Sequence, residues 1–125
     1  MGLKCGDVTE RVIGAAIRVH RALGPGLLES VYETCLAHEL VKAGLRVERQ
    51  VELPVEYDTI TLDCGFRIDL LVDDQVVVEL KAVEKILPIH EAQLMTYLRL
   101  SHKPAGLLIN FNALRLRDGI LRRAN

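Results

Sequence analysis

Hydrophobic positions in the first third of the chain recur at the spacing of amphipathic helices. Apolar residues appear every three or four positions over residues 7–23, which predicts a first helix there. Asp7 is a suitable N-cap, and Glu10 completes a capping-box pattern three residues later. A second apolar stripe starts at Leu27 and ends before Gly44, a residue type that often follows a helix. The sequence therefore predicts two helices separated by a break rich in glycine and proline.

The pattern changes to that of strands after residue 46. Residues 47–56 alternate between apolar and polar side chains, as expected for a strand with one wetter face. Pro54 places that part of the strand at a sheet edge or next to a bulge, because proline cannot donate a ladder hydrogen bond. Residues 66–72 and 76–83 are two further apolar strands, separated by the polar turn Asp73-Asp74-Gln75. These segments predict three consecutive strands.

The last third of the chain returns to a helix and then to strands. Pro88 suits the first turn of a third helix, which the pattern predicts over about residues 89–101. Residues 107–109 form a further strand, and residues 113–121 a last short one. The order ααβββαβ predicts an α+β or mixed α/β fold with a central sheet flanked by helices. Because the chain has 125 residues, we expect residues 1–125 to form a single domain.

Composition narrows the class of protein further. Half of the residues are hydrophobic and 26% are charged, which is typical of globular rather than disordered chains. The three cysteines are an odd number without a C-x-x-C pair, which argues against a disulfide framework and against a zinc or iron–sulfur site. The sequence has no secretory leader pattern and no apolar run approaching about 18 residues. We therefore expect a cytoplasmic protein without a membrane segment.

The charge balance bears on nucleic-acid binding. The formal net charge is −1, whereas tight nonspecific nucleic-acid binders are usually strongly basic. Positive charge still gathers near the C-terminus, at Arg115, Arg117, Arg122 and Arg123. This cluster is either a local basic patch or a solvated strand edge and tail, and the sequence leaves both readings open.

The two strands on either side of residues 73–75 carry the candidate chemistry. Glu79 and Lys81 point to one face of their strand, because alternate residues share a face, while Leu80 points into the opposite layer. If residues 73–75 form a three-residue loop, Asp69 lies directly opposite Glu79. A two-residue loop would shift the register by one and turn Asp69 away. The hypothesis of a metal site therefore makes a strict demand on the register of this hairpin.

Two opposed carboxylates in that register suit a divalent cation. Their Cβ atoms would be about 5 Å apart, and the like charges repel unless a cation neutralises them. Mg²⁺ prefers such hard oxygen ligands. Lys81 beside the cation would orient or deprotonate a water, or stabilise charge on a phosphate. The alternative is a solvated charged face with Lys81 paired to a carboxylate, since the pattern Asp-x9-Glu-x-Lys is short and common by chance.

Polar residues on two predicted helices favour a shared site over a solvated face. Glu29 and Tyr32 lie three residues apart on one face of the second helix. On the third helix His90, Gln93 and Tyr97 form a polar stripe. Glutamine and tyrosine are unusual choices for a face that is only solvated, where lysine and glutamate dominate. We interpret His90 as a surface histidine at the helix end rather than as a catalytic base.

Several segments resemble the GxxExxY proteins. The signature is Gly26-Leu27-Leu28-Glu29-Ser30-Val31-Tyr32, and residues 62–72, 76–100 and 106–112 are similar to the same family. The resemblance extends from about residue 8 to residue 120. The GxxExxY proteins are classed with the PD-(D/E)XK nuclease superfamily, so the resemblance implies a core like that of restriction endonucleases.

The resemblance implies a role for each matching residue. Asp69, Glu79 and Lys81 look like the aspartate, the (D/E) and the lysine of the motif. Ile68 precedes Asp69 where the name of the motif has proline, a position at which many members vary. Glu29 resembles the acidic residue that the first core helix points at the metal.

Further residues are implied around the metal and the substrate. The main-chain carbonyl of Leu80 is a further candidate metal ligand. Gln93 and Tyr97 are similar to the Q-x-x-x-Y element of RecB-like exonuclease domains, whose glutamine and tyrosine border the site. With Tyr32 they are the candidates for positioning substrate.

Three functions remain open at this point. The leading hypothesis is a nuclease dependent on Mg²⁺ or Mn²⁺ that hydrolyses DNA or RNA by attack of a water on phosphorus. The alternative is a non-catalytic module that binds nucleic acid, nucleotide or protein, which would explain the small size and near-neutral charge. A subunit that contributes only a dimer interface is the third, and it leaves the polar helix stripe without a purpose. A homodimer would supply the nucleic-acid surface that the chain lacks, though the sequence does not show one.

Overall fold

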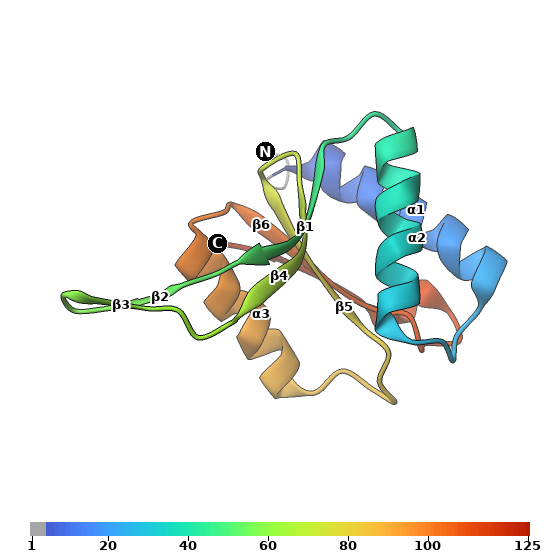
Figure 1. Cartoon of the computed structure of the whole chain (residues 1–125). Coiled ribbons are helices and arrows are strands. Elements are labelled where there is room, and N and C mark those ends of the chain that lie inside the picture. Colours follow the sequence, from blue (N-terminus) through green and yellow to red (C-terminus); the bar gives the residue numbers. More distant parts are fainter. Residues whose placement is uncertain (1–4) are drawn as a thin grey trace.

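A five-stranded mixed sheet lies between two helical layers in the computed structural model, which describes residues 5–125 (Figure 1). Its strand order is β1-β4-β5-β6-β7, and only β5 and β6 run parallel. The elements in chain order are α1 (Gly6–Leu23), α2 (Glu29–Lys42), β1 (Val47–Glu52), β2 (Val55–Tyr57), β3 (Ile60–Leu62), β4 (Arg67–Val72), β5 (Val76–Lys81), α3 (Pro88–Ser101), β6 (Ala105–Asn110), the 3-10 helix η1 (Leu116–Gly119) and β7 (Ile120–Ala124). The mixed α+β architecture that the sequence predicted is confirmed.

Each face of the sheet buries its own apolar core. Helices α1 and α2 cover one face, where Leu36 packs with Val78 and Leu107. Helix α3 covers the other face through Leu94 and other aliphatic side chains. Helix α3 approaches β6 closely at Gly106, where a Cβ atom would lie 2.9 Å from Leu94 Cδ1. This close approach seats α3 against the sheet, and a hydrogen bond from Lys81 to Gln93 connects the polar face of α3 to the end of β5.

The three predicted helices are confirmed, and one predicted cap is wrong. Pro88 begins α3 as expected. Helix α1 begins at Gly6, and Cys5 occupies the N-cap position with no side-chain hydrogen bond. Asp7 therefore lies inside the first turn, where its negative charge is favourable at the positive end of the helix dipole. No helix in residues 5–125 is long and apolar enough to cross a membrane.

The strands differ from the prediction at both ends of the sheet. The expected strand over residues 47–56 is divided at Pro54 into β1 and β2, and β1 forms a sheet edge as proline indicated. Strand β3 was not predicted. The expected strand over residues 113–121 is wrong, because its middle forms η1 and buries Leu116 beneath α1. Strand β7 begins only at Ile120 and pairs with β6.

Strands β2 and β3 form an arm, residues 55–62, that projects from the body of the molecule (Figure 1). The register pairs Val55 with Leu62 and Tyr57 with Ile60, so these four side chains share one face of the ribbon. Tyr57 is 71% exposed and Ile60 51% exposed. The arm is therefore a two-stranded ribbon whose apolar face is exposed at Tyr57, Ile60 and Leu62 within the described residues.

The hairpin of β4 and β5 has the register that the metal-site hypothesis demands. Leu70 pairs with Val78 and Val72 with Val76, which leaves a three-residue loop at 73–75. Leu80 packs in the core beneath α1 and α2, on the face opposite Glu79, as expected from strand alternation. The regular ladder ends at the pair of Leu70 and Val78. The next residues along the two strands are Asp69 and Glu79.

Candidate functional site

Where the β4–β5 ladder ends, the side chains of Asp69 and Glu79 accept hydrogen bonds from the main chain of the opposite strand. The Asp69 main-chain N–H donates to Glu79 Oε2 at 2.9 Å, and the Leu80 N–H donates to Asp69 Oδ2 at 2.9 Å. Each carboxylate thus satisfies a backbone donor that the separating strands would otherwise leave without a partner. The exchange brings the two predicted acidic residues together at the open end of the hairpin.

Burial raises the pKa values of both carboxyl groups, and the charges of nearby acidic groups raise them further. Glu79 is only 5% exposed. Its burial, with the nearby charge of Asp69, raises the pKa of Glu79 to about 8. Burial also raises the pKa of Asp69, and the charge of Glu33 adds to that effect against the opposing hydrogen bond from Leu80. A cation between these groups would offset both the burial of their charges and the repulsion from nearby acidic groups, because it favours the ionised form of each carboxyl.

Hydrogen bonds between side chains connect the end of β5 to α3. Lys81 Nζ donates to Gln93 Oε1 at 3.4 Å, and Gln93 Nε2 donates to the Tyr97 hydroxyl at 3.3 Å. Burial raises the pKa of Tyr97, and the charges of Glu79 and Asp69 raise it further. The predicted lysine, glutamine and tyrosine therefore surround the carboxylate pair from the α3 side.

A cavity of about 530 Å³ opens beside these three polar residues. Lys81, Gln93 and Tyr97 line it together with Val55 at the base of the arm and Phe66 just before β4. The rings of Phe66 and Tyr97 lie 6.3 Å apart between centroids. The cavity thus joins cationic, polar and aromatic side chains, and Lys81 and Tyr97 connect it to the two acids, which do not line it themselves. His90 caps α3, since its Nδ1 accepts the Leu87 N–H at 2.9 Å.

Glu29 and Tyr32 have different environments although both lie on α2. Glu29 is exposed at the first position of α2, and its charge raises the pKa of Asp69 and, to a smaller extent than Asp69 does, that of Glu79. Among residues 5–125 no three acidic, histidine or cysteine side chains cluster closely enough to form a metal site on their own. Glu29 therefore acts on the pair electrostatically, and its expected role as a metal ligand stays a prediction.

The environment of Tyr32 does not fit the expected role in positioning substrate. The side chain is fully buried, and its ring stacks on Phe111 at 4.5 Å between centroids. The hydroxyl donates to the Gly24 carbonyl at 2.6 Å and accepts the Leu27 N–H at 3.1 Å. Tyr32 therefore stabilises the loop that leads into α2. Because Glu29 is the first residue of α2, Tyr32 also positions Glu29 indirectly.

Two residues that the sequence did not single out complete the surroundings of Asp69. Gln50 on β1 donates from Nε2 to Asp69 Oδ1 at 3.3 Å and to Glu33 Oε1 at 2.5 Å. Glu33 is 8% exposed. Glu33 follows Glu29 by four residues, so the helical spacing carried a signal for it. No local pattern pointed to Gln50, because its place depends on the register of β1 with β4.

Comparison with known proteins agrees with this geometry. A family model described as the PD-(D/E)XK nuclease superfamily matches residues 6–123. The chain belongs to this superfamily. Membership supports a nuclease-type function, and PD-(D/E)XK nucleases generally use divalent metals. No curated protein and no solved structure matches the chain.

The donor set of this PD-(D/E)XK chain fits a divalent cation. The N–H and C=O of one strand residue point to the same side, so the Leu80 carbonyl points toward β4, as its N–H does. The next carbonyl, that of Lys81, points to β6, where it accepts the Phe111 N–H at 2.9 Å. Asp69, Glu79 and the Leu80 carbonyl are therefore oxygen donors at the same end of the hairpin, and oxygen is the ligand type that Mg²⁺ prefers.

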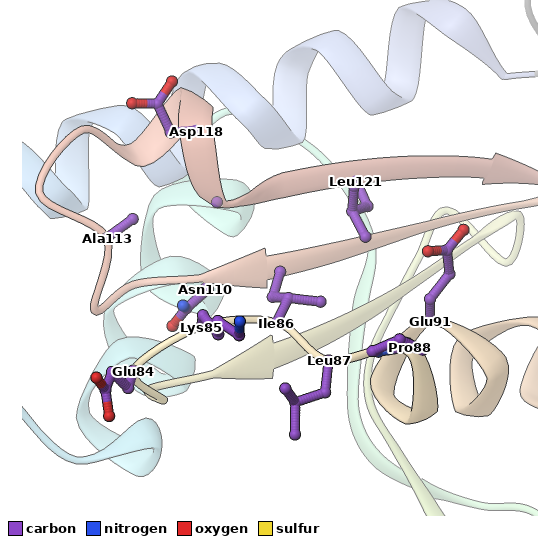
Figure 2. A pocket seen from close by; sticks show the side chains of 11 residues that line it. Glu84, Lys85, Ile86, Leu87, Pro88, Glu91, Asn110, Ala113, Asp118 and Leu121 are labelled. Atoms are coloured by element: carbon purple, nitrogen blue, oxygen red, sulfur yellow. The ribbon is translucent and has the colours of Figure 1, made fainter.

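A second cavity, of about 470 Å³, lies between the loop after β5 and the ends of β6 and β7 (Figure 2). The carboxylates of Glu84, Glu91 and Asp118 point in different directions around it (Figure 2). Its buried amide, that of Asn110, donates to the Val83 carbonyl at 2.9 Å and accepts the Val83 N–H at 3.1 Å. This amide ties the loop to β6, and the cavity offers no convergent polar groups to a ligand.

Proposed function

We propose that this chain is a nuclease that hydrolyses phosphodiester bonds of DNA or RNA and depends on Mg²⁺ or Mn²⁺. The observation that carries the proposal is the exchange of hydrogen bonds between Asp69 and β5. It places two carboxylates with raised pKa values at the open end of the hairpin, with Lys81 on the same face as Glu79. Membership of the PD-(D/E)XK superfamily supports the same class of reaction.

Acidic and carbonyl oxygens would hold the cation in this proposal. When bound, a divalent cation lowers the pKa of its water and neutralises charge on the phosphate. Asp69, Glu79 and the Leu80 carbonyl are the ligands that we propose. Glu29 adds negative charge from the start of α2 and raises the attraction of the site for cations.

The residues toward α3 would bind and orient the substrate. Lys81 donates to Gln93, which holds its ammonium group near the carboxylate pair. From there Lys81 orients the attacking water or stabilises the charge that develops on phosphorus oxygens. Gln93 and Tyr97 form one side of the cavity and position the phosphate. Tyr32 has no part in substrate binding, since it is buried and its hydroxyl is occupied.

A cleavage assay with two substitutions tests the proposal. Labelled single- and double-stranded DNA and RNA are incubated with the parent, Lys81→Met and the matched control Lys85→Met, whose lysine is exposed. We expect Mn²⁺-dependent cleavage by the parent and by Lys85→Met, and a loss of at least about 100-fold in Lys81→Met. Unchanged melting temperatures would exclude misfolding as the cause. Cleavage at the parental rate by Lys81→Met would overturn the role of this lysine in the reaction.

A non-catalytic binding module is the second candidate. The C-terminal arginines favour it over a nuclease, because two of the four are paired within the chain and leave less positive charge for a nucleic-acid substrate. Arg122 pairs with Glu10 at 2.5 Å and Arg123 pairs with Glu91, so half of this cluster is already neutralised. A binding module needs the acidic pair but not the lysine. Mn²⁺ binding by both the parent and Lys81→Met, without cleavage of any of the four substrates, would favour this candidate.

Three finer expectations stay predictions. Membership of the GxxExxY family is supported by Gly26, Glu29 and Tyr32, with Tyr32 fixing the loop before α2. The cytoplasmic location rests on sequence alone. A homodimer, with a second copy extending the nucleic-acid surface, likewise remains a prediction.

A further inference from the structure

Gln50 has a left-handed backbone in the middle of β1, with φ of 52°. A residue other than glycine is uncommon in this region, and it persists there only when its surroundings hold it. The register pairs Arg49 with Leu70 and Val51 with Ile68, so Gln50 falls directly opposite Asp69. The strained residue and the proposed metal ligand are therefore neighbours on adjacent strands.

On both strands, the face of the sheet to which alternate side chains point changes at the pair of Gln50 and Asp69. Residues two apart on a strand normally point to one side of the sheet. On β4, however, Leu70 packs beneath α1 and α2 while Ile68 packs beneath α3. On β1, Arg49 reaches Glu33 of α2 while Val51 packs beneath α3. The left-handed residue is the point at which β1 makes this change, and its side chain is directed along the sheet toward the site.

The amide of Gln50 joins the candidate site to an ion pair between the buried Glu33 and the exposed Arg49. Its Nε2 donates to Asp69 Oδ1 at 3.3 Å and to Glu33 Oε1 at 2.5 Å. The other oxygen of Glu33 accepts two hydrogen bonds from Arg49, at 3.1 and 3.0 Å. The other oxygen of Asp69 accepts the Leu80 N–H. Both oxygens of the Asp69 carboxylate are thus fixed, one by β5 and the other by an amide anchored on α2.

We propose that Gln50 is a positioning residue for Asp69. Its left-handed backbone turns the amide toward the site, and the amide, anchored on Glu33, holds the Asp69 carboxylate in the orientation in which it binds a cation. The inference rests on the proposed function, in which Asp69 is a metal ligand. Outer hydrogen-bond partners of metal ligands typically contribute 10- to 100-fold to metal affinity or activity.

Gln50→Gly separates the role of the amide from that of the backbone. Glycine adopts positive φ without strain, so the substitution keeps the path of β1 and removes only the side chain. We expect Mn²⁺ affinity in calorimetry to fall by about 10- to 100-fold, while the melting temperature stays unchanged or rises. The matched control is Asp58→Gly, because Asp58 also has positive φ, 54°, but lies in the arm. It should leave Mn²⁺ affinity unchanged.

A second substitution and a second readout complete the test. Gln50→Asn retains a residue that tolerates the left-handed region, but its shorter amide cannot bridge both acids, so it should weaken Mn²⁺ binding as well. In the metal-free protein, the Leu80 amide hydrogen should exchange about five- to tenfold faster in Gln50→Gly, since its acceptor Asp69 is less well held. The Val77 amide, within the regular ladder, serves as the internal reference.

The outcomes distinguish this inference from the proposed function. If the parent does not bind Mn²⁺, the proposed function is overturned, and the Leu80 exchange rate alone decides whether Gln50 positions Asp69. If the parent binds Mn²⁺ and both Gln50 variants bind it equally well, the positioning role is overturned and the proposed function stands. Weaker binding in both variants, with parental binding in Asp58→Gly, supports the inference.

Discussion

Burial of Glu79 beside Asp69 makes the stability of the metal-free protein depend on pH. Folding raises the pKa of Glu79 from 4.5 to about 8, so the folded state holds a proton that the unfolded state releases. This group therefore stabilises the folded state most at low pH, and the contribution is lost as pH rises from 4.5 through 8. The loss is at most about 1.4 kcal/mol per pH unit within that window.

Glu79→Gln tests this dependence at the residue scale. Glutamine resembles the protonated carboxyl and can still accept the Asp69 N–H, but it never acquires a buried charge. We expect the variant to be more stable than the parent at pH 9 and about equal to it at pH 5. Urea unfolding in the presence of a chelator measures both differences. An equal difference in stability at the two pH values would show that Glu79 does not titrate as its burial implies.

At the scale of elements, the local sequence pattern was sufficient to predict those helices and strands whose hydrogen bonds join residues close in the sequence. The helices followed from apolar periodicity, and the β4–β5 hairpin followed from a polar loop between two apolar runs. Strand β7 could not be placed this way, because residues 120–124 carry Arg122 and Arg123 and are held by pairing with β6. The apolar residues before them suggested a strand, but Leu116 reaches the core through a 3-10 turn instead.

The arm is the element least connected to the rest of the fold. Strands β2 and β3 contact each other and little else. At the base of the arm the Leu53 N–H donates to the Phe66 carbonyl at 2.9 Å, which continues the pairing of β1 with β4. Residues 54–65 can therefore be replaced by Asn-Gly, a two-residue turn that suits such a pair.

We expect the shortened chain to fold with a melting temperature within a few degrees of the parent and to bind Mn²⁺ equally well. The reason is that the metal ligands lie on β4 and β5, whose ladder the arm does not enter. Thermal unfolding followed by circular dichroism, with Mn²⁺ calorimetry on the same sample, measures both quantities. Loss of cooperative unfolding would mean that the arm belongs to the folding unit.

For the molecule as a whole, a site residue could be predicted where contacts local in the sequence set its position, and not where the pairing of distant segments does. Asp69, Glu79 and Lys81 could be predicted because one short hairpin sets their relative positions. Gln50 could not, because it meets Asp69 only through the register of β1 with β4, across 19 residues of sequence. Tyr32 was misassigned because sequence cannot distinguish a tyrosine at the helix surface from one buried against Phe111.

Calorimetric titration of Mn²⁺ at pH 7, in two buffers of different ionisation enthalpy, tests the central claim that Asp69 and Glu79 bind a divalent cation. Because the pKa of Glu79 is about 8, its carboxyl is protonated at pH 7 and must release that proton when the cation binds. We expect binding by the parent, with release of about one proton, and no binding by Asp69→Ala. Absence of binding by the parent, or equal binding by Asp69→Ala, would contradict the account.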